Sequence, residues 1–406
     1  MSRTKTILYQ MNSWKTYRLG DLCDTISDTY KGCADEVVLI NTSDVLEGKC
    51  LNHTKEPNRN LKGQFKKTFK KYDILYSEIR PANKRFAYID FDTTNYIAST
   101  KLMVLRHNEK IEPLYLYYIL QSQSIIDELQ MLAESRSGTF PQITFAELSR
   151  LEVKLPKREV QRQILGILGA IDDKIENNRR INTNLELQAQ ALFDNLMSNS
   201  NLEYKLIADI DHIIETGRRP KGGVANITSG VPSIGAENIK GLGKYDYSKT
   251  KYITAEFAET LKKGIIKGYE LLIYKDGGKP GYYIPNFSIF GEGFPYDNMT
   301  LNEHVFLLDF GNKGYNFFAY FYMQTEEVMK YLNAQGSKAA IPGINRNDVE
   351  NISIPTIENE AVKEFCERIE PIITSILVNS KESSRLATLR DSLLPKLMNG
   401  EIKVAE

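Results

Sequence analysis

The chain has 406 residues, a length that corresponds to two or more domains of about 100–200 residues each. It carries 52 Lys and Arg residues against 52 Asp and Glu residues, so any affinity for nucleic acid or an acidic membrane has to come from local patches. No stretch approaches the roughly 20 apolar residues of a membrane span, and residues 1–20 contain no signal-peptide core. We therefore expect a cytoplasmic protein.

The four cysteines are scattered along the chain without a CxxC pair. This pattern fits reduced thiols in a cytosol better than a disulfide framework. A zinc site built from Cys23, Cys33, Cys50 and His53 is the alternative, but only Cys50 and His53 have ligand-like spacing. Ordinary buried thiols are the preferred interpretation.

Residues 1–157 are predicted to form a compact α+β domain. Short β-branched and aromatic runs such as "DEVVLINTSDV" and "YDILYSEI" are bounded by turn residues. The domain also contains a basic island at residues 61–85, which stands out in a neutral chain; a solvated face is the ordinary alternative to nucleic-acid binding. Its candidate DNA-binding residues are Lys66, Lys67, Lys70, Lys71, Arg80, Lys84 and Arg85.

Residues 158–199 are predicted to form one long helix. Its apolar seam recurs in alternating steps of four and three residues, which is typical of a coiled coil. Gly166 and Gly169 weaken the first turns, so we expect the helix to begin later or to bend there. The seam residues are Ile164, Leu168, Ile171, Ile175, Asn178, Asn182, Leu185, Ala189, Leu192 and Leu196.

Residues 200–357 are predicted to form a second α+β domain, with strand-like runs such as "YELLIYK" and "NEHVFLLDF". Its positive charge is spread over "TGRRPKGG" and "YKDGGKPGYY", where glycines would let the backbone approach a phosphate. The candidate DNA-binding residues are Arg218, Arg219, Lys221, Lys275 and Lys279. The hairpins "SEIRPANKR" and "KDGGKPG" each follow a matched strand, so both should occupy an equivalent face of their domains.

The carboxyl-terminal segment, residues 358–406, repeats the pattern of the first helix. Pro342 and Ile344 stand 201 positions after Pro141 and Ile143. The same offset gives a second seam, polar where the first is polar and apolar where it is apolar except at Arg390, which corresponds to Ala189: Phe365, Ile369, Ile372, Ile376, Asn379, Ser383, Leu386, Arg390, Leu393 and Leu397. Pro371 is expected to delay or bend this helix.

The matched seams predict that the two helices pair with each other. Asparagines facing each other in an apolar seam forbid registers that leave either one unpaired, so Asn178 and Asn379 are expected to lock the register. Two amphipathic helices packed separately on their own domains are the alternative. The residues expected at the pairing interface are Ile171, Ile175, Asn178, Leu185, Ile372, Ile376, Asn379 and Leu386.

A search for catalytic motifs finds no phosphate loop, no HExxH, no GxSxG and no Cys/His quartet of metal-ligand spacing. His304 lies inside the run "NEHVFLLDF", where a structural or DNA-facing role is expected. Tyr115 and Phe317 belong to aromatic groups with helical spacing, which favours core packing over base stacking. We therefore expect a protein that binds and does not catalyse.

The order of these segments resembles the DNA specificity subunits of Type I restriction-modification enzymes. The resemblance rests on "LPKREVQRQILGILGAIDDKI", "LFDNLM" and the terminal "SLLPKLMNGEI", and it covers essentially the whole chain. It implies an α+β protein with two target-recognition domains, residues 1–157 and 200–357. It also implies two spacer helices, at 158–199 and 358–406, that form an antiparallel coiled coil.

The resemblance further implies a division of labour. Each recognition domain would read one half of a bipartite site in double-stranded DNA, and the paired helices would set the spacer and dock two methyltransferase subunits. The chain itself would hold no cofactor or metal, because S-adenosylmethionine, ATP and magnesium belong to the methyltransferase and restriction subunits. A coiled-coil scaffold without DNA selectivity and a self-sufficient modification or nuclease enzyme are the alternatives.

Overall fold

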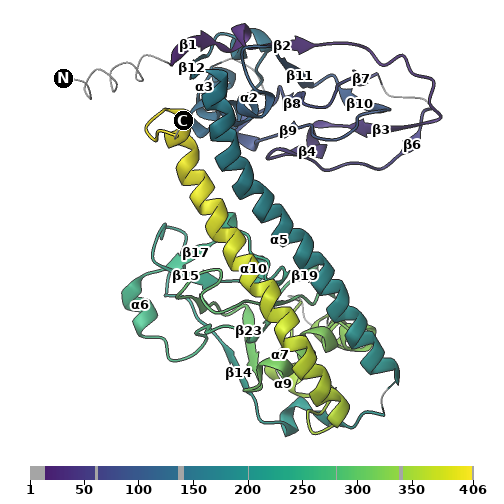
Figure 1. Ribbon diagram of the computed structural model, residues 1–406. Coiled ribbons are helices and arrows are strands. Elements are labelled where there is room, and N and C mark those ends of the chain that lie inside the picture. The colour runs from purple at the N-terminus through teal and green to yellow at the C-terminus, as the bar shows by residue number, and fades with distance from the viewer. Residues whose placement is uncertain are drawn as a thin grey trace. The chain divides into compact units, whose positions relative to one another are not determined.

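The computed structural model describes residues 14–59, 63–135, 141–199, 201–279, 281–337 and 342–404. Residues 1–13, the larger part of the segment 1–20 in which no signal-peptide core is expected, lie outside the described residues. The chain divides into two compact units: unit 1 is Met1–Ile171 with Leu389–Glu406, and unit 2 is Asp172–Thr388. Two long helices, α5 (Arg158–Asn199) and α10 (Glu360–Met398), contribute residues to both units (Figure 1).

Unit 1 is built around an antiparallel four-stranded sheet. The side chains of β8 point alternately to two cores: Ile74 and Tyr76 belong to one, and Leu75 belongs to the other. Because both faces are covered, the strand reads as a continuous apolar run. In spatial order the strands are β2 (Cys23–Ile26), β11 (Leu102–His107), β8 (Ile74–Ser77) and β9 (Phe86–Tyr88).

A second four-stranded sheet packs against one face of this central sheet. Val38 and Ile40 of the second sheet share a core with Leu75 and Val104 of the central one. Its strands, in spatial order, are β6 (Glu56–Pro57), β3 (Glu36–Ile40), β10 (Tyr96–Ser99) and β7 (Phe65–Lys67). Two further pairs complete unit 1: β1 (Lys15–Arg18) with β12 (Glu152–Leu155), and β4 (Val45–Leu46) with β5 (Lys49–Cys50).

Unit 2 repeats this plan. Its five-stranded sheet has the order β14 (Ile213–Thr216), β23 (Val305–Asp309), β18 (Leu271–Tyr274), β21 (Phe287–Ile289) and β16 (Gly241–Leu242). A three-stranded sheet contains β17 (Lys251–Ile253), β15 (Val231–Ile234) and β22 (Thr300–Leu301). The remaining pairs are β13 (Tyr204–Leu206) with β24 (Ser353–Pro355), and β19 (Gly278–Lys279) with β20 (Tyr282–Tyr283).

Short helices cover the other face of each central sheet. The aromatic residues on them are buried: Tyr115 and Phe317 are both 0% exposed, which confirms that they serve the core. In unit 1 these helices are α2 (Pro113–Leu120), α3 (Gln123–Glu134) and α4 (Phe145–Leu148). In unit 2 they are α7 (Lys313–Tyr322), α8 (Glu326–Gly336) and α9 (Arg346–Glu350), while α6 (Ala255–Glu259) follows β17.

Both long helices are continuous where the sequence predicted a delayed start or a bend. Helix α5 begins at Arg158, before Gly166 and Gly169, and α10 runs through Pro371. Each glycine costs about 1 kcal/mol and an interior proline about 3 kcal/mol, but a fully buried aliphatic side chain contributes about 1.5–3 kcal/mol. The seam around these positions is buried, as at Leu168 and Ile369, so packing outweighs the weak helix formers. No helix among the described residues is long and apolar enough to cross a membrane.

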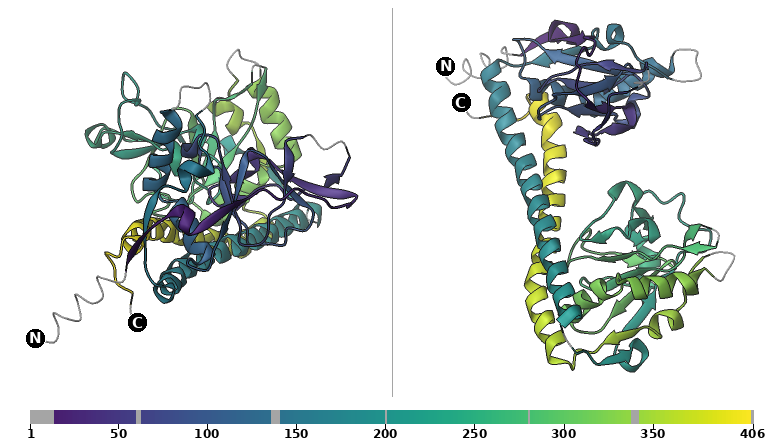
Figure 2. Two further views of the ribbon diagram at one scale, coloured as in Figure 1. Left: turned by 90° about the horizontal axis from the view of Figure 1, so that it is seen from above. Right: turned by 90° about the vertical axis from the view of Figure 1, so that its right-hand side faces the viewer.

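Within unit 2 the two long helices lie side by side and run in opposite directions, which confirms the predicted antiparallel pairing (Figure 2). Asn178 Nδ2 donates to Ser383 Oγ at 3.2 Å, whereas Asn182, one turn later, donates to the carbonyl oxygen of Ile376 at 3.1 Å. The partner number falls as the number along α5 rises. Ile372, Ile376 and Leu185 lie in or against the same apolar core.

The register lock differs in its partners from the predicted pairing of Asn178 with Asn379. The direct side-chain bond joins Asn379 Nδ2 to Asn182 Oδ1 at 2.9 Å. Asn178 instead donates to Glu382 Oε2 at 2.7 Å and reaches only the backbone oxygen of Asn379, at 3.4 Å. The position 201 residues before Glu382 is Ile181, which offers no acceptor, so the two halves of the lock cannot be identical.

Candidate nucleic-acid interface

The cations of the basic island in unit 1 do not form one free surface. Lys66, Lys70 and Lys71 are exposed, and the Lys71 ammonium lies 5.2 Å from the centre of the Tyr72 ring. Lys67 points inward, donating to the carbonyl oxygen of Leu102 at 2.8 Å, and burial lowers its pKa. Residues 61 and 62 of the island lie outside the described residues.

The remaining cations of the island lie at the turn that follows β8. Arg80 is exposed and has a left-handed backbone, with φ of 44°. Lys84 lies 4.0 Å from a carboxylate oxygen of Glu47. Arg85 donates to the carbonyl oxygen of Ser43 at 3.0 Å, so it fastens the turn to the neighbouring loop. Arg85 and Lys67 are therefore structural in this arrangement, which the charge pattern did not reveal.

Three of the candidate cations of unit 2, Arg218, Lys221 and Lys279, do not belong to the group of charged residues around His304. Arg218 stacks its guanidinium 5.4 Å from the centre of the Phe257 ring and donates to Thr260 Oγ1 at 3.1 Å. Lys221 and Lys279 are exposed. Pro280, in the hairpin that contains Lys279, lies outside the described residues.

A short turn after the central strand β8 is held by backbone hydrogen bonds from two other segments. Arg80 N donates to Pro141 O at 3.1 Å, and Ile143 N donates to Glu78 O at 2.8 Å. Glu78 N in turn donates to Lys101 O at 3.0 Å. The segment therefore joins the loop before α4 to the loop before β11.

The turn after β18 in unit 2 repeats this arrangement bond for bond. Gly277 N donates to Pro342 O at 2.9 Å, Ile344 N donates to Lys275 O at 2.9 Å, and Lys275 N donates to His304 O at 2.9 Å. Gly277 has φ of 152°, a conformation that favours glycine. The two hairpins thus occupy equivalent positions in their units, as the sequence predicted.

The side chains on these two scaffolds differ. In unit 1, Lys101 Nζ lies 3.9 Å from Glu78 Oε2 and donates to Gln142 Oε1 at 3.5 Å. In unit 2 the residues at the places of Glu78 and Lys101 are Lys275 and His304. The same backbone positions therefore present different donors and acceptors.

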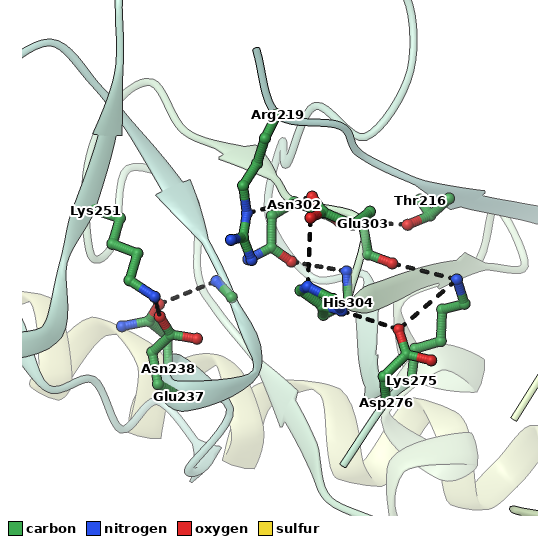
Figure 3. Close-up of polar contacts among 11 residues, drawn as sticks. Thr216, Arg219, Glu237, Asn238, Lys251, Lys275, Asp276, Asn302, Glu303 and His304 are labelled. Carbon is green, nitrogen blue, oxygen red and sulfur yellow. Dashed lines mark hydrogen bonds and ion pairs between the residues drawn. The ribbon is translucent and has the colours of Figure 1, made fainter. Parts of the chain in front are cut away.

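In unit 2 the side chains form a chain of alternating charges (Figure 3). Arg219 Nε lies 3.3 Å from Glu303 Oε2, and His304 Nε2 lies 3.3 Å from Glu303 Oε1. His304 Nδ1 lies 3.0 Å from Asp276 Oδ2, which is 3.8 Å from Lys275 Nζ. We call these five residues the charge relay. All of its side chains are between 24% and 42% exposed, so the relay is partly open to a ligand.

A second ion pair lies beside the relay. Lys251 Nζ is 2.5 Å from Glu237 Oε1. Burial alone would raise the pKa of Glu237, but the hydrogen bond from Lys251 and the charges of Lys251 and Arg219 together lower it. Asn238 is fully buried and accepts from the Gly235 amide at 3.0 Å, while its Nδ2 has no partner among the described residues.

Three members of this region, Arg219, Lys275 and His304, were predicted from the sequence, whereas Glu303, Asp276 and Glu237 were not. A search for basic residues passes over carboxylates, although base edges also offer hydrogen-bond donors. The one available signal was position, because Asp276 lies in the repeated hairpin. Across the described residues no group of three His, Cys, Asp or Glu side chains could hold a metal ion.

Comparisons with known proteins place these features in context. A family model described as "Type I restriction modification DNA specificity domain" matches residues 11–187. The Type I restriction enzyme HindI specificity subunit of Haemophilus influenzae is 31% identical, over 97% of this chain and 100% of that protein. The MjaIX specificity subunit of Methanocaldococcus jannaschii is 25% identical, over 72% of this chain and 69% of that protein.

The fold is also similar to that of a solved structure. The Type I restriction-modification system S subunit from M. genitalium superposes with a TM-score of 0.55 at 15% identity, covering 95% of this chain and 96% of that one. Its likeness supports the mixed architecture of two sheet-rich parts with long helices.

Proposed function

The chain belongs to the family of Type I restriction enzyme specificity subunits, and from this premise we propose that each of its sheet-rich parts reads one half of a bipartite DNA site. The observation that carries the proposal is the repeated turn. Unit 1 and unit 2 use the same backbone hydrogen bonds after β8 and β18 but present different side chains there. Two readers built on one scaffold with different donors and acceptors suit a site whose halves differ.

The paired helices would fix the number of unread base pairs between the halves. Such a role requires one register, and a polar layer inside an apolar seam supplies it because a slipped register would remove the acceptors of the asparagine Nδ2 groups. Asn178 and Asn182, with Asn379, Glu382 and Ser383 opposite them, form that layer.

The chain would act without chemistry of its own. Its partners would be two methyltransferase subunits docked on the helix pair, together with restriction subunits. S-adenosylmethionine, ATP and magnesium would be bound by those subunits and not by this chain. With a formal net charge of zero, the isolated chain is expected to bind DNA weakly, since phosphate contacts would be shared with the partners.

The test is to express the chain with a methyltransferase subunit from the same restriction system and to map methylated adenines on a random DNA library by sequencing. A split motif with a fixed unread gap is the expected result, and the methyltransferase subunit alone is the control. Methylation of one continuous motif would contradict the proposal. No methylation by an assembled complex would favour a scaffold without DNA selectivity, and methylation by the chain alone would favour an enzyme.

A further inference from the structure

Arg219 is held by one edge of its guanidinium group. Its Nε faces Glu303 Oε2 at 3.3 Å, and both atoms are buried without a hydrogen bond of good geometry to any described residue. Its terminal nitrogens donate to none of the residues that the structure describes. The paired nitrogens of the fork are therefore available to a ligand, while the Nε edge is occupied.

The backbone below Arg219 is fixed by close packing. Gly217 N donates to Asn302 O at 3.2 Å, and Thr216 Oγ1 donates to the same oxygen at 3.3 Å. A Cβ atom at Gly217 would collide with the carbonyl oxygen of Leu301, so this close approach requires glycine. Arg219 thus extends from a rigid position, which lowers the entropy lost on binding.

The rest of the relay keeps Glu303 in place. His304 contacts both Glu303 and Asp276, and Asp276 is near Lys275, whose ammonium also donates to the carbonyl oxygen of Glu303 at 3.3 Å. Two cations and two carboxylates therefore surround one imidazole, and their charges cancel. A compensated site attracts a phosphate weakly, whereas base edges offer both donors and acceptors.

We propose that Arg219 reads a guanine in the half-site bound by unit 2, donating from its two terminal nitrogens to O6 and N7 of that base. The inference rests on the proposed function and adds the residue and the base. Glu303 acts as a positioning residue that orients the fork, and His304 with Asp276 orients Glu303. Arginine is suited to this contact because its two parallel donors match the two acceptors that guanine alone presents in the major groove.

The experiment compares methylation motifs of the assembled complex carrying the wild-type chain, R219Q, R219K or E303Q. R219Q should lose the preference for guanine at one base pair of one half-site, by about tenfold or more, while the other half and the gap stay unchanged. R219K keeps the charge but lacks the fork, so it should also weaken the preference for guanine at that base pair. E303Q should weaken this preference less. K330Q, an exposed change on helix α8 outside the candidate DNA-binding residues, is the control and should keep the motif.

The outcomes separate this inference from the proposed function. If the wild-type complex shows no split motif, the proposed function fails. If the wild-type motif is split and R219Q keeps it at a lower overall rate, Arg219 is a phosphate contact and the inference is wrong. Should R219Q fail to assemble with the methyltransferase subunit, R219K and E303Q decide: an unaltered motif in both overturns the inference, and relaxation at one guanine supports it.

Discussion

Unit 1 and unit 2 share a backbone arrangement but carry different side chains at equivalent positions. Each places a buried carboxylate immediately before its central strand, Asp73 before β8 and Glu270 before β18. Asp73 is paired with Arg106 through two hydrogen bonds of 2.8 and 2.7 Å. Both carboxylates also accept from the backbone amide three residues earlier, Asp73 from Lys70 at 2.7 Å and Glu270 from Lys267 at 2.9 Å. Glu270 has no arginine partner among the described residues and accepts a second backbone amide, that of Gly268, at 2.7 Å. The backbone arrangement is thus the same in the two units. The partners of the buried carboxylate differ between them, and so do the side chains proposed to read DNA.

The largest effect on stability is expected at the ion pair between Arg106 and Asp73, which only unit 1 has. Replacing Arg106 with alanine leaves the 2%-exposed Asp73 buried without its cation, which should lower the free energy of unfolding by about 3–5 kcal/mol. Urea unfolding of the wild-type chain and R106A would measure the change. K205A is the control, because the ion pair of Lys205 with Glu358 is 40% and 66% exposed and should contribute at most about 1 kcal/mol. Equal losses in the two variants would contradict this comparison.

A smaller effect should distinguish the two halves of the register lock. N182A removes both the acceptor for Asn379 and the donor to Ile376, so we expect a loss of about 1–3 kcal/mol. S383A removes one of three acceptors of Asn178 and should cost less, because Glu382 still binds that amide. Thermal unfolding of both variants would rank them. If S383A proved the more damaging, the lock would be centred on Asn178 and not on Asn182.

The smallest expected effect is a pH dependence of stability. It should arise only in the half of the register lock in which Asn178 donates to Glu382. The hydrogen bond from Asn178, followed by the interaction with Lys174, lowers the pKa of Glu382 below its usual value. The stability that Glu382 contributes is therefore present above the unfolded pKa, about 4.3, and is lost as the pH falls through the folded pKa. Because Glu382 is 43% exposed, the contribution should be at most about 1 kcal/mol.

The difference in unfolding free energy between the wild-type chain and E382Q, measured by urea unfolding at pH 7, 5 and 3, would test this assignment. The difference should be largest at pH 7 and disappear at low pH. A difference that persists unchanged to pH 3 would show that Glu382 acts through packing and not through its charge.

The sequence was informative where a pattern repeats and weak where contacts are made across the fold. The two seams predicted the helices and their pairing, because a heptad pattern is local and its offset is constant. The sequence could not identify Asn182 as the partner of Asn379, since that pairing depends on which positions of the two helices face each other. Nor could it reveal that Lys67 turns inward, because its acceptor is the backbone of Leu102, 35 residues away.

The candidate site shows the same limit. Arg219 was predicted from its charge, but its partner Glu303 is distant in sequence and lies in the turn before β23, at the start of a run that the sequence predicted as strand throughout. Only the ladder that places β23 beside β14 brings the two side chains together. The acidic residues that orient a basic residue can therefore be identified only from the fold. The basic residue itself can be identified in the sequence from its charge.

The central claim is that each unit reads its own half of the DNA site. Its most direct test is the methylation motif of complexes carrying either the unit 1 variant E78Q/K101Q or the unit 2 variant R219Q. We predict that each variant alters one half-site, that the two variants alter opposite halves, and that the gap between the halves keeps its length. Changes by both variants in the same half, or a change in the gap, would contradict the account.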